Sequence, residues 1–167
     1  MATLFYSTIR PAQDCLTVWT STENEVDVRI EVIKRPSGQL SLSGTFTPTR
    51  QQFYLYGKDL PRDGLNGLGR PTLLEVLKSD SIKVTGPLTA DQPVQYVYVK
   101  TLDLSFPVYP IGPVRLSLPF ERIGNGSPVS MEISITYMAC SDRTCLPPVI
   151  DKHISIQAPA SFFDDQR

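Results

Sequence analysis

The sequence predicts an all-β protein in which antiparallel strands pack as a β-sandwich. Fifteen prolines and ten glycines are spread along the 167 residues, and both residue types interrupt long helices. Short runs rich in valine, isoleucine, threonine, tyrosine and phenylalanine recur between turn signals, and long stretches of helical periodicity are missing. Many short strands separated by turns are typical of a sandwich.

Each predicted strand is a run with strand composition or with alternating apolar and polar residues. The predicted strands are Leu16 to Thr20, Val26 to Ile33, Leu40 to Phe46, Phe53 to Tyr56, Gln95 to Thr101, Val114 to Phe120, Met131 to Ala139 and Val149 to Ile156. Turn residues follow the second run at Arg35-Pro36-Ser37-Gly38 and precede the seventh at Gly124-Asn125-Gly126. These breaks predict tight connections between strands.

Two segments between these runs are ambiguous. Pro71 permits a helix start before Leu73 to Lys78, but Thr72, Val76 and the serines that follow favour a strand. Gly57 to Arg70 is glycine-rich, yet its leucines at positions 60, 65 and 68 predict an ordered loop that buries apolar side chains. A phosphate-binding loop is not supported, because the Gly-x-x-x-x-Gly-Lys-Ser/Thr pattern is missing.

The length predicts a single domain over residues 1–161, and the polar end of the chain predicts a tail or linker over residues 162–167. The 16 basic and 17 acidic residues nearly cancel and form no basic cluster, which argues against nucleic-acid binding. No apolar run approaches the roughly 20 residues of a membrane-spanning helix. Met1 to Pro11 lacks the features of a signal peptide. We therefore expect the chain as given to be soluble.

The most informative feature is the pair Cys140 and Cys145, which flanks the turn-compatible run Ser-Asp-Arg-Thr. A strand precedes the pair and another follows it, so we expect the cysteines to face each other across a hairpin loop. Opposed residues in an antiparallel pair have Cα atoms roughly 4.5 to 5.5 Å apart, which suits a disulfide. Pro147 and Pro148 lack backbone donors, which favours an exposed sheet end and therefore exchange.

Chain entropy bears on the role of such a disulfide. A bond that closes about six residues contributes only ~2 kcal/mol to stability, whereas a bond from Cys15 to either of the others would contribute ~5 kcal/mol. A disulfide selected for stability would span more of the chain. For exchange, the attacking group must be a thiolate. Arg143 in the loop would favour a thiolate, while the neighbouring Asp142 would oppose it.

Three segments resemble the N-terminal domain of the transmembrane thiol:disulfide interchange protein DsbD. They are Val114-Arg-Leu-Ser-Leu-Pro-Phe, then Ser134-Ile-Thr-Tyr-Met-Ala-Cys140 with Cys145-Leu-Pro-Pro148, and Phe53-Tyr-Leu-Tyr56. The resemblance implies an immunoglobulin-like β-sandwich in the periplasm, without a cofactor, that relays reducing equivalents. It implies a thioredoxin-like domain as electron donor. The implied acceptor is a periplasmic disulfide isomerase or a cytochrome-maturation thioredoxin.

The resemblance also implies roles for individual residues. Cys145 would form the mixed disulfide with a partner, Cys140 would resolve it, and Tyr54 and Tyr56 would lie beside the pair. This chain departs from the family in having one residue fewer between the cysteines. The family covers its pair with a Phe-Tyr-Gly cap loop, for which Leu104 to Pro113 offers only Phe106 or Tyr109 as a lid.

Other interpretations of these residues stay open. The pair could be a structural disulfide in a non-catalytic interaction module. Cys140 and Cys145 with Cys15 and His153, the one histidine, would provide four zinc ligands, but His153 has no partner histidine nearby, so we expect no metal. Cys15 itself is expected to be a small buried apolar residue. Tyr54 and Tyr56 share one strand face by parity and are equally consistent with core packing.

Overall fold

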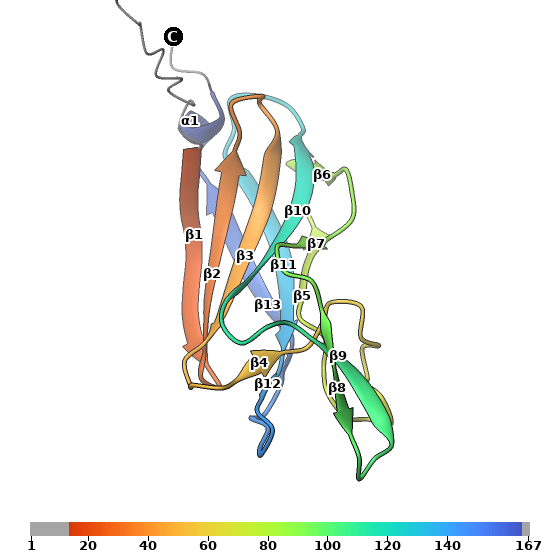
Figure 1. Cartoon of the computed structure of the whole chain (residues 1–167). Helices are drawn as coiled ribbons and strands as arrows, with labels where there is room; N and C mark the ends of the chain where they lie inside the picture. Colours follow the sequence, from red (N-terminus) through yellow and green to blue (C-terminus); the bar gives the residue numbers. More distant parts are fainter. Residues whose placement is uncertain (1–13, 165–167) are drawn as a thin grey trace, which may run out of the picture.

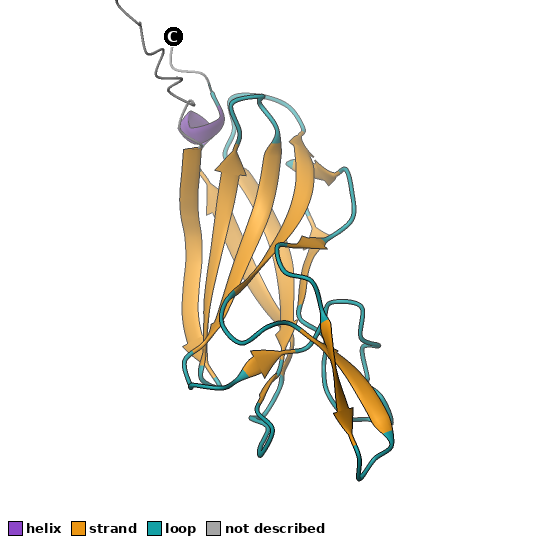
Figure 2. Ribbon diagram, viewed as in Figure 1, coloured by secondary structure: helices purple, strands orange, loops and turns teal. Residues whose placement is uncertain are grey.

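In a computed structural model of the chain, which describes residues 14–164, two antiparallel sheets pack face to face (Figure 1). The larger sheet has the strand order β1-β2-β3-β10-β6, and β7 also pairs with β10. The smaller sheet has the order β13-β11-β5. Strands dominate the chain, and the described residues contain a single short helix, α1 (Figure 2). The prediction of an all-β sandwich of two packed antiparallel sheets is confirmed, and its immunoglobulin-like part stays a prediction.

The strands are grouped by the sheet to which they belong. The larger sheet contains β1 (Asp14–Glu23), β2 (Val26–Lys34), β3 (Leu40–Pro48), β6 (Ile82–Val84), β7 (Thr89–Ala90) and β10 (Val114–Arg122). The smaller sheet contains β5 (Leu73–Lys78), β11 (Val129–Tyr137) and β13 (Val149–Ala158). Outside these sheets, β4 (Tyr54–Leu55) pairs with β12 (Ala139–Cys140), β8 (Gln95–Val99) pairs with β9 (Leu104–Val108), and α1 spans Ala160–Phe163.

The core lies between the sheets and is built from alternate strand residues. In β2, the even-numbered residues from Val26 to Val32 are buried, while Asp27 and Arg29 point to solvent. Phe46 from β3 meets Tyr137 from β11 edge to face, with ring centroids 5.7 Å apart. Burying a large apolar side chain contributes roughly 1.5 to 3 kcal/mol, so this alternation fixes the strand register.

Each predicted strand is present, including Leu73–Lys78, with bounds that differ by a few residues. The main correction concerns Met131 to Ala139, which is not one strand. A register shift between Ile135 and Tyr137 and a break at Met138 separate β11 from β12. The bulge bends the chain out of the sandwich. As a result, Cys140 pairs with β4 in a separate ladder.

The loop from Gly57 to Arg70 is ordered, as predicted. The Arg70 guanidinium donates to the carbonyls of Asp63, Gly67 and Gly69 at 3.1, 3.0 and 2.6 Å. Leu60 is buried in a second apolar cluster, which also contains Tyr56, Phe106, Val108 and Cys140, and Leu65 packs against this cluster. The expectation was wrong for Leu68, which is 44% exposed. The loop is therefore held by one arginine and anchored by leucines near its start.

The C-terminal segment is ordered further than expected. Phe162 and Phe163 belong to α1 and pack against the core, and the Arg122 guanidinium lies 5.1 Å from the Phe163 ring centroid. The tail predicted from Phe162 therefore does not begin at that residue. The last three residues of that tail, and the N-terminal segment assessed for a signal peptide, lie outside the described residues.

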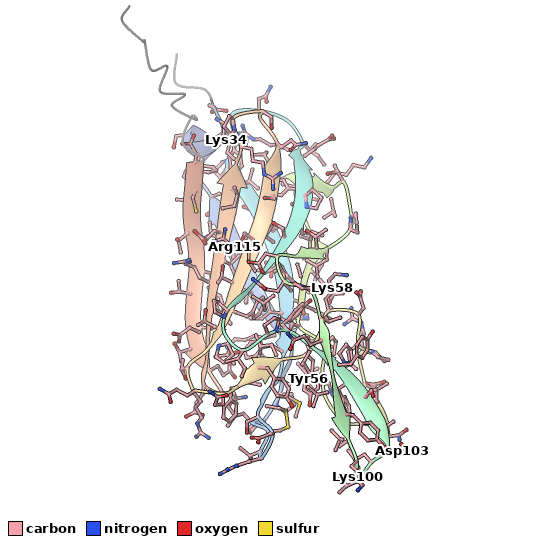
Figure 3. The ribbon with its side chains drawn as sticks, in the orientation of Figure 1. Lys34, Tyr56, Lys58, Lys100, Asp103 and Arg115 are labelled. Atoms are coloured by element: carbon pink, nitrogen blue, oxygen red, sulfur yellow. A yellow bond between two sulfur atoms is a disulfide. The ribbon has the colours of Figure 1, made fainter. Side chains whose placement is uncertain are left out.

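The two ends of the sandwich differ (Figure 1). The helix α1 lies at one end, and the pairs β4–β12 and β8–β9 lie at the other. Tyr56 and the disulfide lie at this second end, where Lys100 and Asp103 mark the tip of the β8–β9 hairpin (Figure 3). Within residues 14–164, no helix is long and apolar enough to cross a membrane.

Candidate functional site

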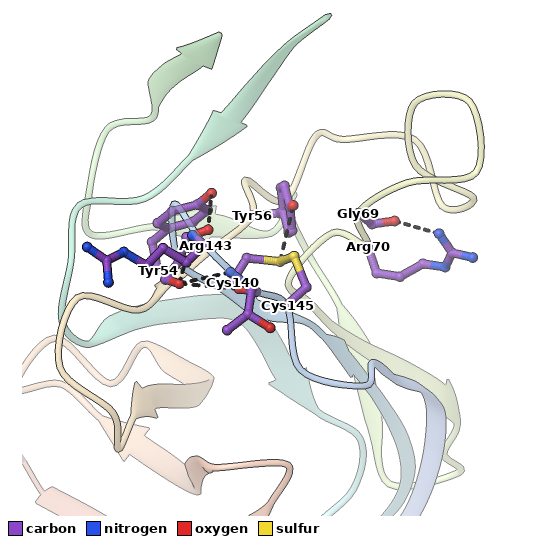
Figure 4. The surroundings of a disulfide bond; sticks show 9 residues. Tyr54, Tyr56, Gly69, Arg70, Cys140, Arg143 and Cys145 are labelled. Carbon is purple, nitrogen blue, oxygen red and sulfur yellow. Dashed lines mark hydrogen bonds between the residues drawn. A yellow bond between two sulfur atoms is a disulfide. The ribbon is translucent and has the colours of Figure 1, made fainter. Parts of the chain in front are cut away.

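Cys140 and Cys145 form a disulfide within a very short hairpin (Figure 4). Their Cα atoms are 4.0 Å apart, slightly closer than the sequence predicted. Two backbone hydrogen bonds flank the bond, from Ser141 N–H to the Thr144 carbonyl at 2.7 Å and from Leu146 N–H to the Ala139 carbonyl at 2.9 Å. This pattern makes the cysteines a non-hydrogen-bonded pair of an antiparallel ladder, in which opposed side chains lie closest.

The turn between the cysteines is stabilised by its own first residue. The Ser141 hydroxyl accepts hydrogen bonds from the N–H groups of Arg143 and Thr144, both at 3.2 Å. Serine side chains commonly stabilise tight turns in this way. Asp142 and Arg143 are exposed, and the Arg143 guanidinium points away from the sulfur atoms (Figure 4). Neither side chain therefore donates to the disulfide in this structure.

The two sulfur-bearing residues have opposite environments. Cys140 is fully buried, whereas Cys145 is exposed. The Tyr56 hydroxyl donates a hydrogen bond to Cys140 Sγ over 3.3 Å. Burial, and to a lesser extent Tyr54, raises the pKa of Tyr56 to about 12, so its hydroxyl keeps its proton at neutral pH. A partner can therefore approach Cys145, whereas the Cys140 sulfur is buried beside a hydroxyl donor.

Tyr54 lies beside Tyr56, on the β4 side of the ladder. The two rings meet edge to face with centroids 6.1 Å apart. The Tyr54 hydroxyl donates to the Ser141 carbonyl over 3.4 Å, and burial, followed by the charge of Asp142, raises its pKa. Both tyrosines therefore lie at the pair. Tyr56 contacts a sulfur atom and Tyr54 contacts the turn.

The two lid candidates occupy different places. The Phe106 ring lies 5.7 Å from the Tyr56 ring, in the apolar cluster that contains Cys140. Tyr109 accepts a hydrogen bond on its hydroxyl from Lys58 N–H at 3.0 Å and belongs to the main core. Both side chains are buried while Cys145 is exposed. The lid role of either residue stays a prediction.

A cleft of about 710 Å³ separates the β8–β9 hairpin from the disulfide turn. Tyr54, Val97, Tyr109 and Ile111 line its walls, together with the turn residues 141–144. Ile111 is 58% exposed. The cleft gives the end that carries the disulfide an apolar hollow next to the turn.

Cys15 was predicted to be buried, and this prediction is wrong. Cys15 lies opposite Ile33 in the β1–β2 pair, on the outward face of the sheet, and is exposed. Its Sγ donates to a Glu31 carboxylate oxygen at 2.5 Å. His153 is exposed on β13. No group of three or more potential metal ligands occurs among the described residues, and the disulfide occupies two of the three sulfurs of the zinc alternative.

Sequence reasoning missed the strand that supports Tyr56. Tyr56 forms a bridge with Val108 of β9, Gly57 N–H donates to the Pro107 carbonyl at 2.9 Å, and Tyr109 N–H donates to the Leu55 carbonyl at 2.8 Å. The alternation of Leu104, Phe106 and Val108 is the signal that indicates this strand. Pro107 obscured it, because proline is uncommon inside strands.

The fold and the site define a class, an all-β sandwich domain with a hairpin disulfide that exposes one sulfur-bearing residue. No protein-family model matches the chain, and no curated protein matches it in sequence. Among solved structures, the chain is similar to the N-terminal domain of DsbD from Neisseria meningitidis in the reduced form. The identity is 15%, the TM-score is 0.47, and the match covers 71% of this chain and 78% of the other. The similarity is one of fold.

Proposed function

We propose that this domain carries out thiol–disulfide exchange with protein partners through Cys140 and Cys145. The observation that carries the proposal is the asymmetry of the pair, with Cys145 exposed and Cys140 buried against the Tyr56 hydroxyl. Exchange needs one sulfur that a partner can attack and a second that leaves as a thiolate. The donor at Cys140 stabilises that thiolate, because hydrogen bonds to charged groups are stronger than those between neutral groups.

The step balances without a cofactor. A partner thiolate attacks Cys145 Sγ, the bond between the two cysteines breaks, and Cys140 leaves with the electron pair as a thiolate. In the reverse direction, Cys140 attacks the mixed disulfide at Cys145 and releases the partner as a thiolate. Cys145 is thus the residue that meets the partner, and Cys140 resolves the intermediate.

The size of the loop supports a reactive role over a purely structural one. The disulfide closes a sequence separation of only 5. A loop of this size contributes ~2 kcal/mol through chain entropy. The core between the two sheets contains more than two dozen buried apolar residues. Stability therefore depends on packing far more than on this bond.

The proposal extends to partners and compartment. A thioredoxin-like domain would reduce the pair, and the pair would reduce a disulfide isomerase or a cytochrome-maturation thioredoxin. Such traffic belongs to an extracytoplasmic compartment such as the periplasm, where protein disulfides persist. The exposed turn at Asp142 and Arg143 and the adjacent cleft give such a protein a surface to approach.

The test is the redox equilibrium of the pair, measured by alkylation and intact mass across a glutathione series. Exchange proteins have midpoints of about −180 to −270 mV, and structural disulfides lie below about −300 mV. We expect a midpoint in the first range. A bond that stays oxidised below the second limit would instead identify a structural disulfide in an interaction module.

A further inference from the structure

The disulfide lies at the end of a backbone ladder that is separate from the sandwich sheets. Cys145 bridges to Cys140 of β12, β12 pairs with β4, and Tyr56 after β4 bridges to Val108 of β9. β9 then pairs with β8. One edge of this ladder is β8, and the opposite edge is the segment that contains Cys145.

Cys145 leaves this edge open. In a non-hydrogen-bonded pair, the N–H and C=O of each residue point away from the partner strand. Those of Cys140 point toward β4, with which Cys140 pairs at Tyr54. Those of Cys145 point out of the ladder, and across residues 14–164 neither group has a hydrogen-bond partner. An exposed residue with both groups free is a template for one more strand.

The open edge is only one residue pair long. Beyond Cys145, the Pro147 carbonyl already accepts a hydrogen bond from the Asn24 side chain at 2.9 Å, and the two prolines provide no N–H. Before Cys145, the Arg143 N–H is bonded to the Ser141 hydroxyl. A segment that adds here is therefore placed in a single register, with its own residue opposite Cys145.

That register suits sulfur transfer. A residue opposite Cys145 in a hydrogen-bonded antiparallel pair would have its Cα about 5.5 Å away, within the 4.4 to 6.8 Å usual for disulfides. The disulfide joins neighbouring segments of the ladder, so its bond runs across the strands. A thiolate on the added segment would approach Cys145 Sγ from the side opposite Cys140, which is the direction that displacement requires.

We propose that, besides thioredoxin-like partners, the domain reacts with proteins whose cysteine lies in an extended polypeptide segment, which adds to this edge as an antiparallel strand. The inference rests on the proposed exchange function and adds a class of substrate to it: a cysteine in an extended, unpaired segment. Two main-chain hydrogen bonds at Cys145 position the partner cysteine, and side-chain identity contributes little at this point. A single residue pair gives weak binding, which suits a transient intermediate.

The experiment compares two blocked pentapeptides that have a central reduced cysteine between valine and threonine residues. One has a normal backbone. The other is N-methylated at the cysteine, so that its cysteine has no N–H to donate and the methyl group obstructs pairing with Cys145. Both react with the oxidised full chain, and formation of the mixed disulfide is followed by quenched mass spectrometry. Reaction of both peptides with oxidised glutathione controls for their intrinsic thiol reactivity.

We expect the normal peptide to react about five- to tenfold faster with the chain after this correction, the effect of losing one hydrogen bond. Equal corrected rates would overturn strand addition while leaving the exchange function intact. A chain that reacts with neither peptide nor with reduced glutathione would overturn both proposals. Failure of strand addition and failure of the exchange function therefore give different results.

A second measurement observes the edge itself. In the Cys140→Ser variant, a mixed disulfide with the normal peptide is trapped at Cys145, and amide hydrogen exchange is recorded by NMR. We expect the Cys145 amide to exchange rapidly in the free chain and to become protected in the adduct. Protection in the free chain that rises with protein concentration would assign the edge to a second copy of the chain and overturn the proposal.

Discussion

Cys15 and Cys145 are both exposed cysteines at the margin of a β-ladder, yet their surroundings differ. Cys15 is a free thiol that donates to the Glu31 carboxylate, which is itself almost fully buried. Partial desolvation of the sulfur, followed by the hydrogen bond and the charge of Glu31, raises the pKa of Cys15 to about 11. Cys145 is bonded to a sulfur that accepts a hydrogen bond from Tyr56.

This difference shows that exposure alone does not make a cysteine reactive. At neutral pH a thiol with a pKa of about 11 is almost wholly protonated, and the thiolate is the nucleophile. Cys145 needs no thiolate of its own when the pair is oxidised, because it is the atom attacked. The neighbouring groups therefore decide whether a cysteine exchanges: the Glu31 carboxylate keeps Cys15 protonated, and the Tyr56 hydroxyl favours release of Cys140 as a thiolate.

The largest contrast is expected from removing each cysteine separately. Cys145→Ser should abolish disulfide transfer to a reduced thioredoxin-like protein, since no sulfur remains for the partner to attack. Cys15→Ser should transfer at the parent rate. A gel-based alkylation assay measures both, and circular dichroism checks that each variant is folded. Transfer that survives in Cys145→Ser would show that the exchanging sulfur lies elsewhere.

The next contrast concerns the packing behind the pair. Phe106→Ala removes a buried ring that contacts Tyr56 and should lower the free energy of unfolding by about 3 to 5 kcal/mol. Urea unfolding measures this loss, and a change below about 1 kcal/mol would contradict the packing described. The same variant tests the lid: faster exchange with glutathione supports shielding, and an unchanged rate argues against it.

Removing the Tyr56 hydroxyl, which donates to Cys140 Sγ, is expected to have a smaller effect and to change only the rate of exchange. Tyr56→Phe keeps the ring and removes the donor, and hydrogen bonds to charged groups contribute about 1.5 to 3 kcal/mol. Reduction by glutathione should slow roughly ten- to hundredfold. Tyr54→Phe is the matched control, because its hydroxyl contacts the Ser141 carbonyl and no sulfur. Equal slowing in both variants would assign the effect to packing.

The smallest effect is expected at Cys15. Glu31→Gln removes the negative charge that opposes the thiolate, so the pKa of Cys15 should fall from about 11 and the alkylation profile should shift to lower pH. At pH 8 the rate should rise about three- to tenfold, less than the gain in thiolate because nucleophilicity falls with pKa. The disulfide leaves Cys15 as the free thiol of the oxidised protein. An unmoved profile would leave desolvation as the whole cause.

Most of the sandwich could be predicted from the sequence because its main strands span nine or ten residues, enough to show an alternating pattern. The Val26 to Val32 run has this pattern, and its valines and isoleucine lie in the core. The strands β6 and β7 were not predicted, because three residues and two residues are too short to show a period. Cys15 was misplaced because it precedes the predicted run Leu16 to Thr20, so no alternation assigned it to a face; it lies on the outward face of the edge strand β1.

The site was predictable in its residues but not in its arrangement. The spacing of Cys140 and Cys145 indicated the hairpin, and parity placed Tyr54 and Tyr56 on one face. Their distances to sulfur depend on the bulge before Tyr137 and on the bridge from Tyr56 to Val108. Both are contacts between segments far apart in the sequence, which local patterns do not encode.

The two hydrogen bonds that flank the disulfide join backbone atoms and do not involve the sulfurs, so we expect them to persist when the bond between the sulfurs is broken. After Cys145 has reacted with a partner, they still keep Cys140 across the ladder from it, which gives its thiol a high effective molarity toward the mixed disulfide. The covalent intermediate should therefore be short-lived in the native protein. Isolation of physiological partners as stable adducts accordingly calls for Cys140→Ser as bait.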